Sequence, residues 1–548
     1  MTAPLSNGTS SSSPAPFCSS SSSGADPLST LGDQVHDRIG RPVDRWAVVA
    51  TLEAMGLRDA DARRDLNLPD LFAAGDAIYQ TIDATDRGSP VLSPIKNSTL
   101  WSHTARAVRS VGRGILFVAP MALQVAAVLL LGYSLWAWLY FTEAQATVVA
   151  LGTLLSFIVT GGFVQSIGRN GHLYLSQNNP RLADRTCRRL IGLGLLTVGI
   201  VTLVLTVTSL VFPYYPYRLV GISTVYFVLL SALWLSLSVL YVLDHLSAIV
   251  GITLLGLVPV AGVMVYTDWG IHVAHALGLA VAAGCAYGYG LFVFRRRIRR
   301  SPSPAGSNTL PPLSIQIHSL RHYFGYGLCF FTFLSVDRLI AWSVAHPEPL
   351  PYIIWFRTPY ELGLDWALLS LLCTLAVLQH TVYTLSDWLF PKTGLMSTSV
   401  RQSTRDIKRF HLRHLLFVTT VGLGSIVGTY YGVRAVDGSA LLPNTLILLD
   451  NTVTMLVYWT AAVSYLFLAI GLYNLLFSLI LSHPHLAIRS FLYALAINVG
   501  VGLLLSRALH YEYAVFGLLA GSLFLAVLSF VWTRRFLTSF PYHYYAAF

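Results

Sequence analysis

The chain has 548 residues, of which 54% are hydrophobic and 11% are charged. An ordinary soluble domain has about 25% charged residues, so this composition excludes a water-soluble globule of this size. The net charge of +11 would suit nucleic-acid binding in a soluble protein, but residues 1–100 carry a net charge of −4 and the remainder a net +15. The positive charge therefore belongs to the hydrophobic part, and no nucleic-acid partner is expected.

The N-terminal region differs in composition from everything that follows. Residues 1–41 are predicted to be a disordered tail, because Ser, Pro, Gly and Thr dominate the first 30 or so and cannot bury enough apolar surface. Residues 42–99 are predicted to be a small cytoplasmic helical segment, with apolar residues at helical spacing from Trp46 to Met55. A docking or regulatory role and an inert spacer are both open for this segment.

The rest of the chain consists of apolar stretches, each long enough to cross a hydrocarbon core of about 30 Å. The pair Asp244-His245 separates the fourth span from the fifth and is expected to contribute only loop charges. Without that break the number of predicted membrane spans would fall by one. The twelve predicted spans are 114–140, 147–169, 189–212, 218–243, 246–266, 270–294, 320–345, 359–386, 412–434, 452–480, 486–508 and 513–535.

The distribution of Lys and Arg fixes the predicted orientation, because both are enriched in cytoplasmic loops. With the N-terminus inside, 23 of the 28 basic residues beyond residue 100 fall on the cytoplasmic side. Arg218, Arg357, Arg434 and Arg507 fall outside, and Arg338 lies within a span. Twelve spans with both termini in the cytoplasm are therefore the consistent solution.

A basic, Pro- and Ser-rich segment divides the spans into two sets of six. The predicted fold is an all-α integral membrane protein with two six-helix bundles, residues 100–294 and 319–548, joined by a cytoplasmic linker at 295–318. Because six is an even number, both halves enter the membrane from the same side, as parallel repeats do.

Charged side chains within the predicted spans are costly, at about 2.5–3.5 kcal/mol or more at a helix centre. Asp337 and Arg338 are adjacent in the outer third of span seven and point about 100° apart on a helix. Glu361 and Asp365 begin span eight at a similar depth, on one helical face. Arg338 can therefore pair with either acid of span eight. A structural salt bridge, a substrate or proton pathway and an ordinary interfacial charge are the three interpretations.

Common catalytic motifs are absent from the sequence. It contains no phosphate-binding loop, nucleophile elbow, His-Glu-x-x-His pair or dinucleotide fingerprint, and its five cysteines show no metal-site spacing. The predicted outer loops are short, whereas a membrane-embedded glycosyltransferase usually carries larger ones. We therefore predict a protein that is not an enzyme and has no catalytic residue, metal or cofactor.

The stretch Asp337-Arg338-Leu339-Ile340-Ala341-Trp342 resembles the pattern of the PelG family, in which Asp and a Lys or Arg precede apolar residues and Trp. Span four and the C-terminal region, with Tyr473-Asn474-Leu475-Leu476-Phe477, also resemble this family in their pattern of residue types. The resemblance covers about residues 100–548. Only Asp337, Arg338 and Trp342 can be matched by position.

The PelG family comprises exopolysaccharide exporters of the MOP (MATE-like) flippase superfamily. The resemblance implies two six-helix bundles around a central cavity, a cytoplasmic glycosyltransferase partner and accessory membrane proteins. We therefore predict an exporter of an exopolysaccharide or its precursor in a bacterial inner membrane, with Asp337, Arg338, Trp342, Glu361 and Asp365 as transport-pathway candidates. A multidrug or lipid exporter of the same fold and a membrane-embedded glycan-assembly enzyme or scaffold are the alternatives.

Overall fold

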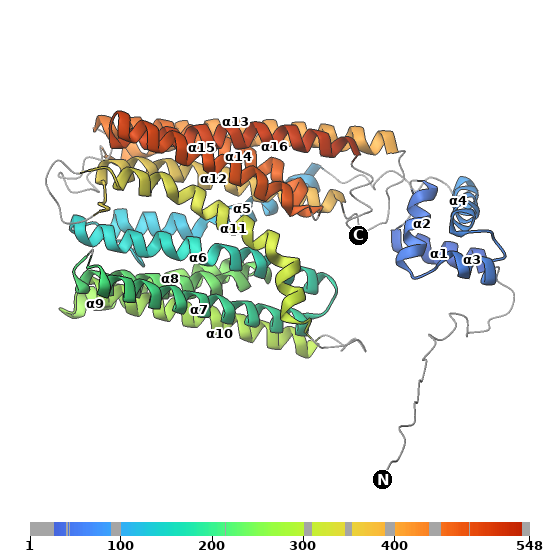
Figure 1. Ribbon diagram of the computed structural model, residues 1–548, viewed down its shortest axis with the longest axis horizontal. Helices are drawn as coiled ribbons and strands as arrows, with labels where there is room; N and C mark the ends of the chain where they lie inside the picture. Colours follow the sequence, from blue (N-terminus) through green and yellow to red (C-terminus); the bar gives the residue numbers. More distant parts are fainter. Residues whose placement is uncertain are drawn as a thin grey trace, which may run out of the picture. The chain divides into compact units, whose positions relative to one another are not determined.

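The computed structural model describes residues 27–39, 42, 44–88, 100–213, 215–300, 310–345, 353–389, 400–437, 451–481 and 483–539. The chain divides into two compact units, Met1–Asn97 with Phe390–Ser403, and Ser98–Leu389 with Thr404–Phe548. The regular elements of the described residues are all helices (Figure 1).

The smaller unit contains helices α1 (Pro27–Ile39), α2 (Arg45–Ala54), α3 (Asp59–Asp65) and α4 (Leu71–Gly88). Helix α1 lies inside the range predicted to be a disordered tail, and that prediction is wrong for Pro27–Ile39. The composition of the tail hid a short amphipathic segment, in which Val35 is fully buried and Leu28 and Leu31 pack against the same apolar core. Helix α2 starts at Arg45 because the Asp44 side chain caps it, accepting a hydrogen bond from the Ala47 amide.

The larger unit contains the membrane helices. Twelve helices of the described residues are long and apolar enough to cross a bilayer, as the sequence predicted. The chain is therefore a multi-pass membrane protein. These helices are α5 (Leu100–Leu131), α6 (Glu143–Ser176), α7 (Pro180–Val211), α8 (Tyr217–Val242), α9 (Leu246–Tyr266), α10 (Ile271–Arg300), α11 (Leu313–Trp342), α12 (Thr358–Leu389), α13 (Val400–Asp437), α14 (Thr452–Ile480), α15 (Pro484–Ala508) and α16 (Val515–Phe536).

Several boundaries differ from the predicted spans. The first membrane helix ends at Leu131 rather than at residue 140, because Gly132 has a φ of +79° and starts a tight turn. The Gln124 side chain accepts a hydrogen bond from the Leu135 amide and holds this turn against α5. The predicted linker at 295–318 is shorter in the structure, since α10 continues to Arg300 and α11 begins at Leu313.

The two sets of six helices pack in the same pattern. In the first set α6 packs on α8, and α10 packs on α8 and α9. The equivalent helices of the second set, each six positions later in the chain, pack likewise. Helix α12 packs on α14, and α16 packs on α14 and α15. The two sets meet where α5 contacts α12 and where α6 contacts α11 (Figure 1). This equivalence supports the parallel repeat that the span count suggested.

Helix α11 is shared between the two cores, although the sequence placed it wholly in the second bundle. Leu320, near its start, is buried in the apolar core of the first set of helices. Phe333, Ile340 and Trp342, towards its end, are buried in the core of the second set. Hydropathy identifies α11 as a membrane span, but it does not show which helices pack against each half of α11.

Small residues allow α6 and α11 to approach closely. A Cβ atom built on Gly161 would lie 2.3 Å from the Phe331 ring and 2.9 Å from the Gly327 carbonyl oxygen. A Cβ atom on Gly327 would lie 2.3 Å from the carbonyl oxygen of Gly161. Such glycine contacts are typical of membrane helices, whose backbones associate through van der Waals packing.

We predict that Gly161→Ala destabilises the protein by about 1–3 kcal/mol, because the added methyl group forces α6 and α11 apart. Unfolding of the purified protein in detergent measures the change. The matched control on the same helix is Gly168→Ala, because nothing lies within 4 Å of a Cβ atom there. Equal stability of the two variants would contradict a close crossing.

Candidate functional site

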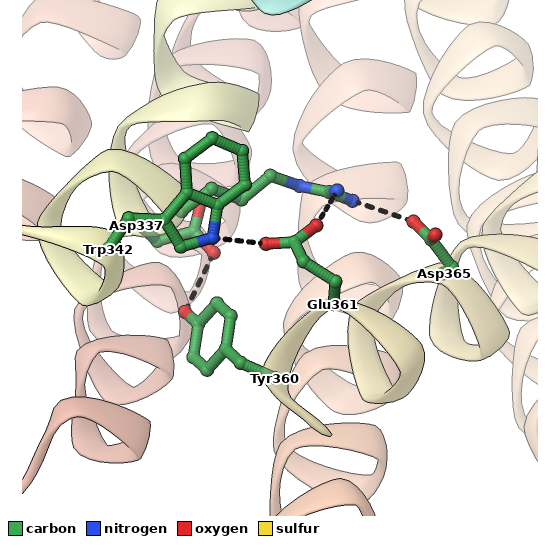
Figure 2. Close-up of polar contacts among 6 residues, drawn as sticks. Asp337, Trp342, Tyr360, Glu361 and Asp365 are labelled. Carbon is green, nitrogen blue, oxygen red and sulfur yellow. Dashed lines mark hydrogen bonds and ion pairs between the residues drawn. The ribbon is translucent and has the colours of Figure 1, made fainter. Parts of the chain in front are cut away.

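The four charged residues singled out in the sequence come together where the end of α11 meets the start of α12. Asp337 and Arg338 lie in the last two turns of α11, and Glu361 lies in the first turn of α12. Asp365 follows one turn later on the same face as Glu361. Figure 2 shows the side chains of Glu361 and Asp365 reaching towards α11.

Arg338 forms ion pairs with both acids of α12. One guanidinium nitrogen donates to Glu361, and the other lies 3.2 Å from Asp365. The Arg338 side chain is 14% exposed and that of Glu361 4%, whereas that of Asp365 is 59% exposed. The pairing predicted from helical spacing is therefore present. It links Arg338 to one buried carboxylate, Glu361, and to one exposed carboxylate, Asp365.

Asp337 faces away from this ion pair, as the angle between neighbouring residues on a helix predicted. Its Oδ2 atom accepts a hydrogen bond of 3.1 Å from the hydroxyl of Tyr360 (Figure 2). Asp337 is 1% exposed, and its Oδ1 atom has no hydrogen-bond partner among the described residues. Such a buried, half-satisfied carboxyl group is costly to maintain and is characteristic of functional sites.

Trp342 connects the cluster to the end of α11. Its indole N–H donates to Oε1 of Glu361 over 2.8 Å, while Oε2 of the same carboxylate pairs with Arg338. Trp342 entered the sequence analysis only through the family resemblance, and the structure brings it into the cluster. Two side chains, Arg338 and Trp342, thus share the buried Glu361 carboxylate.

Two tyrosines of this site were missed from the sequence. Tyr360 of α12 and Tyr465 of α14 are at most 2% exposed. Tyr465 lies beside the Arg338 guanidinium. Only the position of Tyr360 directly before Glu361 offered a signal. Tyr465 lies more than a hundred residues further along the chain, and no local pattern distinguishes it from other core aromatics.

The cluster contains three carboxyl groups and one guanidinium group. If all are ionised, the local charge is negative, so the site has capacity for a further cation or for protons. Among the residues that the structure describes, no group of three or more His, Cys, Asp or Glu side chains is arranged to hold a metal ion.

Asp244, expected to be a simple loop charge, connects the two sets of helices at the predicted cytoplasmic end. It pairs with Arg113 of α5 over 3.3 Å and accepts a hydrogen bond of 3.3 Å from Tyr383 of α12. The Arg113 guanidinium also lies 5.3 Å from the centre of the Tyr383 ring. Asp244 lies in the turn between α8 and α9 with a 44% exposed side chain, as expected of a loop charge. Its contacts in addition tie α5 and this turn to α12.

Solved structures with the same fold are MATE transporters. An outward-facing multidrug resistance MATE transporter of the MOP superfamily aligns with a TM-score of 0.52 at 12% identity, covering 80% of this chain and 97% of that one. An inward-facing structure aligns with a TM-score of 0.52 at 11% identity, covering 80% and 96%. A mutant of the Vibrio cholerae MATE transporter VcmN aligns with a TM-score of 0.54 at 15% identity, covering 79% and 97%.

No protein-family model matches the sequence, and no curated protein sequence matches it either. The structural likeness therefore shows the fold alone, which is the helical arrangement of the MATE transporters, as predicted. About a fifth of the chain lies outside this likeness.

We predict that Arg338→Met destabilises the protein by about 3–5 kcal/mol, because it leaves the buried Glu361 carboxylate without its counter-charge. The double variant Arg338→Met/Glu361→Gln recovers most of this loss. Asp365→Asn changes stability by only about 0.5 kcal/mol, since its side chain is 59% exposed. Chemical unfolding in detergent measures all three variants, and equal stability of the single and double variants would refute the buried pair.

Proposed function

We propose that this protein is a membrane exporter that works by alternating access between its two sets of helices. The MATE-type fold and the repeated packing pattern support this proposal, because two equivalent bundles can rock about the contacts of α5 with α12 and of α6 with α11. The polar contacts of Asp244 at the predicted cytoplasmic end are of a kind that can break and reform.

The observation that carries the proposal is the excess of carboxyl groups around Arg338. A charged cluster within a membrane helix pair is costly, and such clusters mark transport pathways and other functional sites. The Asp365 side chain is 59% exposed, while Glu361 and Asp337 are buried. The cluster thus offers an exposed first contact and a buried second one to a cation.

We propose an exopolysaccharide or its precursor as the cargo. The PelG-like stretch from Asp337 to Trp342 supports this choice, and its three matched residues all lie in or beside the cluster. The carboxyl groups suit a saccharide that carries free amino groups, or a coupling proton. The Arg338 guanidinium provides hydrogen-bond donors of the kind that bind hydroxyl groups.

A multidrug exporter is the second candidate. The solved structures with this fold include multidrug resistance transporters, and a carboxylate cluster accepts a cationic drug as readily as an amino sugar. Drug resistance conferred by expression of the protein, without any effect on polysaccharide, would favour this candidate.

The setting of the protein is part of the proposal. We place it in a bacterial inner membrane with both termini in the cytoplasm, where a glycosyltransferase supplies the saccharide and accessory membrane proteins assist. In that topology the small helical unit around Val48 and Ile78 lies on the side where the glycosyltransferase works, and it serves as a docking element.

The triple variant Asp337→Asn/Glu361→Gln/Asp365→Asn is made in an Arg338→Met background, so that no buried guanidinium is left without a counter-charge. It is expected to insert normally but to export poorly. Inside-out vesicles receive labelled nucleotide sugars, and total polymer and the fraction protected from added glycosidase are measured. We expect unchanged synthesis with at least a tenfold loss of protected polymer. The control is Asp268→Asn, an exposed carboxylate at the same predicted end.

Full protection of polymer by the triple variant would contradict a role for the three carboxyl groups in export. Loss of synthesis in vesicles that lack the protein would instead identify an obligate part of the polymerising machinery. No change in either quantity without the protein would exclude saccharide export and leave the drug or lipid exporter.

A further inference from the structure

The segment Ile353–Arg357, between α11 and α12, is called the strap here because it reaches from the second set of helices to the first. The Trp355 indole N–H donates to Glu143 of α6 over 2.8 Å. The Phe356 amide donates to the Thr147 hydroxyl over 3.0 Å. These contacts join residues more than two hundred positions apart, across the two sets of helices at the predicted outer end.

A third contact anchors the beginning of the strap. The hydroxyl of Tyr215, in the connection between α7 and α8, donates to the Ile354 carbonyl oxygen over 2.7 Å. Thr147 is fully buried, and Trp355 is 9% exposed. The strap therefore covers the outer start of α6 rather than passing over it in solvent.

The other edge of the strap is attached to the end of α11. The Trp355 amide donates to the Trp342 carbonyl oxygen over 3.0 Å, and the Phe356 ring lies 5.4 Å from the Trp342 ring. Arg357 donates to the Val344 carbonyl oxygen over 2.9 Å. Every anchor of the strap is a hydrogen bond or a ring contact, so the strap can detach without breaking a covalent bond.

Trp342 is the residue that joins the strap to the carboxylate cluster. Its carbonyl oxygen and ring contact the strap, while its indole N–H is bound to Glu361. Trp342 is 1% exposed, so its ring cannot turn without disturbing both sets of contacts. Asp365 also pairs with Arg338, but no hydrogen bond or ion pair connects it to Trp342.

We propose that the strap is the outer gate of the export pathway and that Glu361 controls it through Trp342. When a cationic group of the cargo draws Glu361 away, Trp342 loses its acceptor and the strap releases Glu143 and Thr147. The inference rests on the proposed export function, since it assigns a regulatory role to the same carboxylate cluster. It couples occupancy of the site to opening at one end, which alternating access requires.

The test uses the full-length protein with its five native cysteines replaced and a single new cysteine from Thr147→Cys. Thr147 lies beneath the strap, so the rate of its reaction with a membrane-impermeant maleimide, added to cells or right-side-out vesicles, measures opening. The contacts of the strap with Glu143 and Tyr215 remain in this parent, so we expect slow labelling there. We expect at least tenfold faster labelling after Trp355→Ala. Trp355→Phe, which keeps a smaller aromatic ring but removes the N–H donor, is the conservative second variant.

Control by Glu361 is tested in the same parent. Glu361→Gln and Trp342→Phe should each accelerate labelling, because each weakens the hydrogen bond between these two side chains. Asp268→Asn, an exposed carboxylate between α9 and α10 and outside the cluster, should leave the labelling rate unchanged. Unaltered labelling after both Trp355 substitutions overturns the gate. Equal acceleration by Asp268→Asn and Glu361→Gln overturns the route through Trp342.

The labelling measurement needs no cargo, so it separates this inference from the proposed function. Fast labelling of the Trp355 and Glu361 variants, in a protein that exports no saccharide, would support a gate for another cargo and refute only the choice of saccharide. Normal saccharide export together with unaltered labelling would refute the gate and leave the export function in place.

Discussion

The buried guanidinium of Arg338 imposes the constraint on which the rest of the site depends. A permanent positive charge with 14% exposure in a membrane helix must be neutralised nearby, because neither lipid nor the apolar core solvates it. Glu361 and Asp365 of α12 provide that neutralisation, so the end of α11 and the start of α12 are held together. Trp342 then completes the hydrogen bonding of Glu361, and the segment that follows is attached to Trp342.

Apolar packing and polar contacts have different places in the membrane unit. The crossing of α6 and α11 is made by Gly161 and Gly327, which bring backbones together without charged groups. Ion pairs and hydrogen bonds join the two sets of helices towards the ends, through Asp244 at one end and Glu143 at the other. A close backbone crossing in the middle and polar contacts towards the ends suit a pivot between the two sets of helices. The polar contacts can exchange with water, whereas the packed backbones separate less easily.

The sequence predicts those features that depend on local periodicity. Hydropathy over about 20 residues defines the twelve spans, and the helical repeat correctly separates Asp337 from Arg338 while placing Glu361 beside Asp365. The partners of Tyr465, Asp244 and Trp355 could not be predicted, because each depends on which distant helices pack together. Helix α1 was missed for another reason, since the Ser-rich composition around it concealed the few apolar residues that pack on α4.

The unequal exposure of the two acids that hold Arg338 gives the site an order of events. A cation arriving from solvent meets Asp365 first, since Glu361 is 4% exposed and lies behind the guanidinium. Loss of Asp365 alone leaves Arg338 paired with Glu361, and the hydrogen bond to Trp342 is unaffected. Only a cation able to compete for Glu361 as well disturbs Trp342. A cargo with several amino groups, such as a partly deacetylated saccharide, meets that requirement more readily than a single small cation does, because a second amine is already held near the site when the first has bound.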